Sequence, residues 1–415
     1  MVPINSNRLV EAPAPGIRVD PSDLGRRGRR GFRLVLAAGT AMMVGASAPS
    51  PFYPVIQAEL GFTPAMTTAV FAVYAVALLV ALLVVGSVSD HLGRRPVISV
   101  GFVLLATSVV LFWHADGAAG FVAARVLQGL ASGLLLSALS AAVVDLEPRD
   151  RPGSAAVGNA VTPMAGLALG ALVSGAVLDV AGDRAATGVF GTLTVLYLAL
   201  AVAVWTVPET APRLGGLWAS LRPRAALPGD VRAVFVRSAP AVFAGWATGG
   251  LYLSLGPAIV ATEFGGTAHL AQGLVVTLLA GTGAAAGYLV RHRTPRFITL
   301  YGTTALAVGT AATLGALALG SLPLYFLAVV VAGSGFGTAF FGVLRSITPL
   351  TRPDDRAEVF AAIFVISYTA FGVPAVIAGL LVPHLGLAAT TYGYGAVIVA
   401  LAAAAALLRG FGSRD

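Results

Sequence analysis

Long apolar stretches alternate with short polar segments along nearly the whole chain. About 20 mostly apolar residues suffice for a helix to cross a bilayer, and each stretch reaches that length within a residue or so. We therefore predict an all-α polytopic membrane protein with twelve transmembrane helices in two pseudo-symmetric halves of six. The predicted spans are residues 33–56, 65–88, 96–114, 118–145, 154–180, 186–207, 236–262, 268–290, 297–319, 322–348, 357–382 and 386–408.

The longest polar break between spans divides the chain into two halves. Corresponding positions recur in the two halves: Gly86 pairs with Gly287 and Arg95 with Arg296 at one offset, and Gly129 pairs with Gly333 at a slightly larger one. Such parallel repeats are typical of transporters that bind their substrate between the halves. The predicted units are a disordered cytoplasmic tail (1–32), a first half (33–207), a cytoplasmic linker (208–235), a second half (236–408) and a C-terminal tail (409–415).

The composition fits this class of protein and excludes several kinds of chemistry. Hydrophobic residues make up 57% of the chain and charged residues only 11%, against about 25% charged in a soluble domain. All 26 basic residues are arginine and there is no cysteine, so lysine-based and thiol catalysis, disulfides and a lysine-containing phosphate loop are excluded. The spans carry no histidine cluster and no nucleophile–base pair. We expect no enzyme activity, no catalytic residue and no metal site.

The arginines predict how the chain is oriented in the bilayer. With a cytoplasmic N-terminus, the tails and inner loops hold 24 of the 26 arginines, as the positive-inside rule requires. The net charge of +8 therefore reflects membrane orientation rather than nucleic-acid binding. We expect a multi-pass protein of the plasma (inner) membrane with both termini in the cytoplasm. Arg29-Arg30 before the first span also matches a twin-arginine signal, an alternative that the continuing apolar pattern disfavours.

The loop between the second and third spans concentrates charge in a very short segment. Residues 86–95 read GSVSDHLGRR, with Asp90 at the end of one span and Arg94-Arg95 opening the next. A carboxylate at this depth is costly unless it pairs with arginine or lies at a helix N-terminus, and a pair of that kind can act as a latch. The alternative is an ordinary positive-inside loop with one stray acid.

The fourth span carries a second group of polar residues, Arg125, Gln128 and Gly129. A guanidinium inside the membrane faces a cavity or a partner, because exposure to lipid is costly. The alternative is an arginine whose side chain extends to the outer interface. The same span ends at Asp145, which falls at the depth of Arg94 if the second and fourth spans are neighbours.

These segments resemble the Major Facilitator Superfamily, whose signature loop reads G-x-x-x-D-R/K-x-G-R-R/K. The chain departs from it once, with His91 in place of Arg or Lys. The fourth-span motif and Pro208-Glu209-Thr210 after the sixth span are also similar to this family. The resemblance implies that the two halves rock around a central site, that Asp90 contacts the start of span 11 (residues 356–360) and that Arg94 pairs with Asp145. It assigns a conformational latch to Gly86, Asp90, Gly93, Arg94, Arg95 and Asp145, and coupling to Arg125, Gln128 and Gly129.

In this family spans 1, 4, 7 and 10 line the substrate cavity, and here they carry aromatic residues with almost no charge. Such a lining suits an apolar or amphipathic ligand. For each ring the alternative is packing or lipid contact, and a glycine–proline stretch in the fifth span does not fit the spacing of antiporters. The candidate cavity residues are Met43, Tyr53, Tyr74, Pro163, Trp246, Tyr252, Phe340, Phe341 and Tyr368.

We therefore expect a secondary transporter that exports small lipophilic or amphipathic compounds by proton antiport. Proton coupling is not explained by the spans themselves, because their acids, such as Asp179 and Glu263, lie near the ends. One alternative is an importer or facilitator of a small metabolite, with Arg125 as counter-ion to an anionic substrate. Another is a receptor or assembly factor with a transporter-like fold. The expected partners are a small-molecule substrate and the lipid bilayer, without nucleic acid or cofactor beyond a proton gradient, and the expected functional unit is a monomer.

Overall fold

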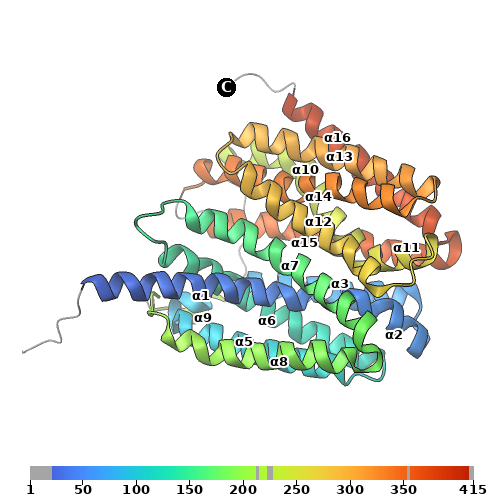
Figure 1. The fold of residues 1–415 in the computed structure, drawn as a ribbon. Helices are drawn as coiled ribbons and strands as arrows, with labels where there is room; N and C mark the ends of the chain where they lie inside the picture. The colour runs from blue at the N-terminus through green and yellow to red at the C-terminus, as the bar shows by residue number, and fades with distance from the viewer. Residues whose placement is uncertain (1–20, 212–214, 222–227, 353–355, 411–415) are drawn as a thin grey trace, which may run out of the picture.

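The computed structural model describes residues 21–211, 215–221, 228–352 and 356–410 of the 415-residue chain. Within these ranges the regular elements are helices, and twelve of them are long (Figure 1). They are α1 (Pro21–Ser47), α3 (Pro64–Val85), α5 (Arg94–Trp113), α6 (Ala118–Asp145), α7 (Ser154–Ala181), α8 (Ala185–Ala203), α10 (Gly229–Ser254), α12 (His269–Leu289), α13 (Pro295–Ala318), α14 (Leu322–Ile347), α15 (Arg356–Leu385) and α16 (Leu387–Gly410).

Ten stretches in the described ranges are long and apolar enough to cross a membrane by length and composition. One of them, Ser154–Thr206, contains both α7 and α8. The long helix outside these stretches is α10, whose first turns carry Asp230, Arg232 and Arg237. The twelve expected spans correspond to ten stretches because α7 and α8 fall within one stretch and α10 lies outside them.

Prolines and glycines divide two of the predicted spans. The first span breaks after Ser47, where Pro49 precedes a 3-10 turn that contains Pro51, and the short helix α2 (Tyr53–Leu60) follows. The seventh span breaks at Gly256-Pro257, where α10 gives way to the short helix α11 (Gly256–Glu263). At the other end α1 begins at Pro21, so the structure has helix over residues 21–32, where we expected a disordered tail. Residues 1–20 lie outside the described residues.

The helices before and after the linker form two groups, which we call the first half (α1–α8) and the second half (α10–α16). In Figure 1 the second half lies above the first, and the helices of both halves run roughly side by side. The halves meet where α7 packs against α12 and α3 packs against α15. We call the end that carries residues 86–95 and the short linker helix α9 (Leu217–Ser220) the linker end, and the end that carries α2 and α11 the opposite end.

Glycines allow equivalent helix pairs in the two halves to pack with almost no space between their backbones. A Cβ atom at Gly129 on α6 would lie 2.5 Å from the carbonyl oxygen of Tyr74 on α3. In the second half, a Cβ atom at Gly333 on α14 would lie 2.5 Å from the carbonyl oxygen of Leu279 on α12. Small residues at such crossings let membrane helices approach closely. The glycine repeat in the sequence therefore has a packing explanation.

The glycine-rich stretch of the fifth span also serves packing. Gly166 on α7 lies against Thr40 and Met43 of α1, and Gly170 lies against Val44 of the same helix. One face of α7 is thus pressed onto α1, while another reaches α12 of the second half. The helix links the interior of its own half to the interface between the halves.

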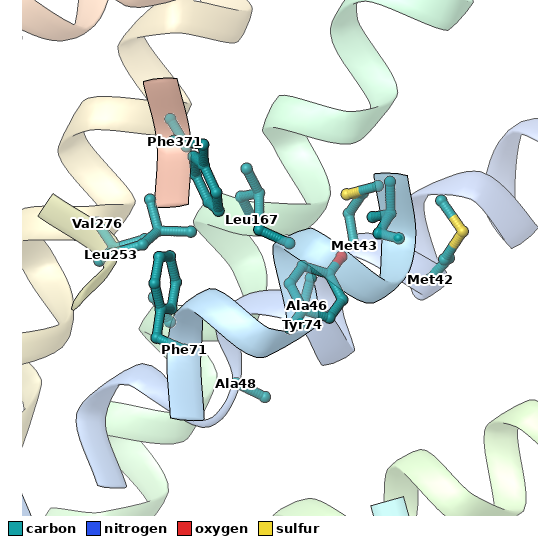
Figure 2. Close-up of a cluster of buried hydrophobic side chains, with 14 of the residues drawn as sticks. Met42, Met43, Ala46, Ala48, Phe71, Tyr74, Leu167, Leu253, Val276 and Phe371 are labelled. Carbon is teal, nitrogen blue, oxygen red and sulfur yellow. The ribbon is translucent and has the colours of Figure 1, made fainter. Parts of the chain in front are cut away.

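Buried side chains from both halves form one large core, and a smaller separate cluster lies within the second half. Figure 2 shows Phe71 of α3 pointing toward Phe371 of α15, with Leu253 of α10 and Val276 of α12 beside them. The ring centroids of Phe71 and Phe371 are 5.0 Å apart. The halves are therefore joined by apolar contact at mid-length.

The packing of α6 on α3 gives a stability prediction. Gly129→Ala places a methyl group against backbone atoms that have no freedom to move aside, and overpacking of this kind costs about 1–3 kcal/mol. We expect a lower unfolding temperature in detergent for this variant. Gly315→Ala on α13 is the matched control, because a Cβ atom there meets nothing within 4 Å. Equal unfolding temperatures for the two variants would contradict the close-packing explanation.

Candidate functional site

The 86–95 loop folds as a short helix between two long ones. After α3 ends at Val85, α4 (Val88–Leu92) makes a single turn and α5 begins at Arg94. The connecting residue Gly93 has φ 108°, a left-handed conformation that side chains disfavour. A Cβ atom there would also lie 2.9 Å from the Glu209 carboxylate. Gly86, by contrast, lies in the turn before α4, where the atoms nearest to a Cβ atom belong to Leu82 of its own segment.

Arg94 is the centre of the charge cluster at the linker end. Its side chain is nearly buried, with Nη1 2.5 Å from Asp90 Oδ1 and 2.6 Å from Ser89 Oγ. Its Nε lies 3.2 Å from Asp145 Oδ2 at the end of α6. A guanidinium removed from water requires such partners, since one left uncompensated would strongly destabilise the fold. The structure thus brings Arg94 and Asp145 together as the resemblance implied.

Asp90 lies within the same cluster, paired with Arg94 of its own loop. The contact that the resemblance implied for Asp90 involves residues 356–360 at the start of α15. The side chains of residues 353–357 lie outside the described part of the chain. The described partners of Asp90 therefore belong to the first half.

Glu209, directly after the sixth span, completes the cluster and was not among the predicted site residues. Its carboxylate accepts hydrogen bonds from the backbone N–H groups of Arg94 (2.8 Å) and Arg95 (3.2 Å), which open α5. The N–H groups of Thr210 and Ala211 donate to it at 3.0 Å. Partial burial raises the pKa of Glu209, but the hydrogen bonds from Ala211, Arg94, Arg95 and Thr210 outweigh it and the pKa is lowered. The sequence signal was the Pro208-Glu209-Thr210 motif after the sixth span.

The hydroxyl of Thr210 donates a hydrogen bond of 2.8 Å to Asp145 Oδ2, so the first residues of the linker hold both α5 and α6. Farther along the linker, the hydroxyl of Ser87 contacts the carbonyl oxygen of Ser220 in α9 at 3.5 Å. The 86–95 loop is thus tied to its own half and to the linker.

Arg125 forms a second polar centre, inside α6. Its side chain has 0% exposure, which rules out extension to the membrane surface. It donates to Gln128 Oε1 at 2.5 Å and to the hydroxyl of Tyr53, and Gln128 Nε2 in turn donates to the carbonyl oxygen of Gly45 at 2.8 Å. The rings of Tyr53, Tyr74 and Phe112 lie 5.5–5.6 Å from the guanidinium carbon. Within the described residues no carboxylate lies within 4.0 Å of this guanidinium, so aromatic faces and neutral acceptors stabilise the charge.

Three of the predicted cavity residues gather in one aromatic cluster. The ring of Trp246 on α10 lies 5.4 Å from Phe340 on α14 and 4.8 Å from Tyr368 on α15. Phe371 extends the cluster at 5.9 Å from Trp246 and reaches Phe71 of the first half (Figure 2). Phe71, which lies one helical turn before Tyr74, was not among the predicted residues.

The other predicted cavity residues lie elsewhere. Tyr252 donates to Thr313 Oγ1 at 3.0 Å and so packs α10 against α13, and Phe341 lies 5.7 Å from the guanidinium of Arg345. Met43 packs against Gly166, and Pro163 lines a small cavity within the first half. Tyr53, besides its bond to Arg125, lines a cavity of about 300 Å³ between the halves at the opposite end. Gln57 and Glu263 line the same cavity.

The helical fold and the motif geometry agree with comparisons to known proteins. The family model of the Major Facilitator Superfamily matches residues 35–373. The chain belongs to the Major Facilitator Superfamily. It is a multi-pass membrane transporter rather than an enzyme, and the fold class expected from the sequence is confirmed.

Individual relatives are more distant. The inner membrane transport protein YnfM of Escherichia coli (strain K12) is 28% identical over 204 residues, which is 46% of this chain and 46% of that protein. The match therefore spans about half the length of this curated relative. A bacterial homologue of the human lysosomal transporter Spinster has a TM-score of 0.72 at 14% identity, covering 92% of this chain and 97% of that one. The nucleoside transporter NupG has a TM-score of 0.69 at 14% identity, covering 91% and 99%. At these identities the structures share the superfamily fold.

The Glu209 cap gives a pH-dependent prediction. A carboxyl whose pKa is lowered on folding stabilises the fold above its ordinary value of 4.5, and this contribution is lost as the pH falls through the folded pKa. We expect Glu209→Gln to lower the unfolding temperature at pH 7 and to match wild type increasingly as the pH falls below 4.5. Glu59→Gln, at an exposed position, is the control. A pH-independent difference between Glu209→Gln and wild type would contradict the cap.

The 86–95 loop gives a prediction about transport. Asp90→Asn removes the charge that pairs with Arg94 while leaving Asp145 and Glu209 in place. Because a latch acts between conformations, we expect the variant to fold and insert but to transport several-fold more slowly. Initial rates for any compound carried by wild type, normalised to protein in the membrane, measure this. Full activity, equal to that of the exposed-site control Asp116→Asn, would contradict the latch and leave the loop with no role beyond positive charge on the cytoplasmic side.

Proposed function

We propose that this transporter exports small lipophilic or amphipathic compounds by alternating access, driven by proton antiport. It works as a monomer in a bacterial plasma membrane, with the linker end and both termini in the cytoplasm. The distribution of arginines supports this orientation, and similarity to an inner membrane transport protein supports the location.

The aromatic cluster carries the proposal. Trp246, Phe340, Tyr368, Phe371 and Phe71 come from α10, α14, α15 and α3, so both halves contribute to it. Within the described residues, the ring contacts of these five are with other aromatic rings, and the five lie in or against the two clusters of buried apolar side chains. Apolar and aromatic surfaces that both halves supply fit a ligand with a large apolar part.

The carboxylates near the helix ends are the candidates for proton coupling. Asp90 and Asp145 surround Arg94 at the linker end, and Glu263 lines the cavity at the opposite end. A group that gains and loses a proton on alternate sides of the membrane must be reachable from each side in turn. This placement supports coupling through carboxylates at the linker end and the opposite end rather than through a mid-membrane acid.

Arg125 favours a second candidate, the uptake of a small anionic metabolite. Its guanidinium is fully buried, and Nε has no hydrogen-bond partner within the described residues. Tyr53, which accepts a bond from it, also lines the cavity at the opposite end. An anion that enters this cavity would contact Tyr53, which is hydrogen-bonded to the Arg125 guanidinium.

Transport by the purified protein in liposomes distinguishes the two candidates. A panel of lipophilic dyes and small organic anions is tested with and without a pH gradient. Dye movement that requires the gradient supports export by antiport. Movement of anions alone, independent of the gradient, would overturn the export proposal in favour of the metabolite carrier.

The aromatic cluster can be tested by one substitution. Trp246→Ala removes the ring that touches Phe340, Tyr368 and Phe371, so we expect the apparent affinity for a transported dye to fall about tenfold or more. Trp205→Ala is the matched control, since this tryptophan is 54% exposed in the 3-10 turn that follows α8. Concentration dependence of dye transport gives the measurement. An unchanged KM for Trp246→Ala would place the substrate elsewhere.

A further inference from the structure

Asp179 makes an unusual set of contacts at the opposite end of the bundle. It lies in the last turn of α7, in the first half, and faces the start of α12, in the second half. Its Oδ1 accepts a hydrogen bond of 2.8 Å from the backbone N–H of His269, and its Oδ2 accepts one of 2.8 Å from that of Leu270. The imidazole Nδ1 of His269 lies 3.0 Å from Oδ1.

These contacts use two of the free backbone N–H groups at the N-terminus of α12. The first N–H groups of a helix have no acceptor within the helix, and the helix dipole places partial positive charge at the same point. A carboxylate that accepts two of these N–H groups is therefore held by both geometry and charge. The contact depends on the backbone of residues 269 and 270 more than on the imidazole.

The contact crosses from one half to the other, unlike the charge cluster at the linker end. Among the ion pairs of the described residues, Asp179–His269 is the pair that joins the halves. The partners of Arg94 belong to the first half and the linker. The hydroxyl of Ser50 adds a further interhalf bond at the opposite end, 3.1 Å to the carbonyl oxygen of Leu253.

Glycines next to Asp179 leave no room between the two helices. A Cβ atom at Gly175 would lie 2.7 Å from the carbonyl oxygen of His269. A Cβ atom at Gly273 on α12 would lie 2.5 Å from the carbonyl oxygen of Ala171 on α7. The helices are therefore in backbone contact where Asp179 reaches the N-terminus of α12.

We propose that Asp179 is an interhalf latch that closes the opposite end of the transporter by capping α12. Its release separates α7 from α12 and is the step that opens this end. The proposal rests on alternating access, as proposed above, but its test reads the distance between the halves and needs no substrate. A wrong substrate assignment therefore leaves the test intact.

The native chain contains no cysteine, so spin labels can be placed at chosen positions alone. Leu60→Cys with Leu319→Cys reports the separation of the halves at the opposite end, and Leu92→Cys with Leu289→Cys reports it at the linker end; all four positions are exposed. We expect Asp179→Asn to raise the population with the longer distance at the opposite end about threefold, because the amide keeps one acceptor oxygen but loses the second acceptor and the negative charge that the helix N-terminus favours. The linker-end distance should shorten in parallel.

Two matched variants separate the cap from a general charge effect. Asp183→Asn removes an exposed acid four residues away and should leave the distances as in wild type. His269→Ala keeps both backbone donors and should shift the populations much less than Asp179→Asn. Identical distance distributions for Asp179→Asn and Asp183→Asn would overturn the latch.

A measurement on the wild-type protein covers the case in which Asp179→Asn does not fold. If Asp179 accepts hydrogen bonds from His269 and Leu270, their amide hydrogens should exchange more slowly than is usual in the first turn of a helix. Leu387 and Ala388, in the first turn of α16, provide the comparison. Equally fast exchange at both helix starts would overturn the proposal.

Discussion

The capping of helix N-termini by carboxylates is the interaction on which the ends of this bundle depend. Glu209 caps α5, Glu147 Oε1 accepts a 2.8 Å bond from the N–H of Ala155 at the start of α7, and Asp179 caps α12. Each acid lies outside the helix that it caps, and Glu209 and Asp179 tie their helices to distant parts of the chain. A membrane helix needs this at its ends, because the first N–H groups lack partners and lipid supplies none.

Carboxylate caps join different parts of the molecule at the two ends. At the linker end Glu209 joins α5 to the linker, and Arg94 joins α5 to α6, so the described contacts strengthen the first half as one body. At the opposite end Asp179 joins α7 to the second half. The apolar core at Phe71 and Phe371 lies between these ends, where both halves meet without charge.

The long apolar stretches predict the membrane helices, and a motif of fixed spacing predicts the pairing of Arg94 with Asp145. The direction of individual side chains could not be predicted. Tyr252 faces α13 while Trp246, six residues earlier, faces the aromatic cluster, and the difference depends on how α10 is rotated in the bundle. Glu209 and Asp179 were difficult to assign for another reason: their partners are backbone N–H groups, which leave no mark on the sequence of the capped helix.

The strength of a carboxylate cap suits a molecule that must change shape repeatedly. Such a contact contributes about 0.3–1 kcal/mol at an exposed helix end and up to about 2 kcal/mol when partly buried. Asp179 lies at an exposed helix end, so its cap biases the equilibrium between two conformations without fixing one permanently. A buried network like that of Arg125, with three aromatic rings and a glutamine, would be far too costly to break in each cycle. The chain thus keeps its deeply buried charge inside one half and places a weaker, reversible contact where the halves must separate.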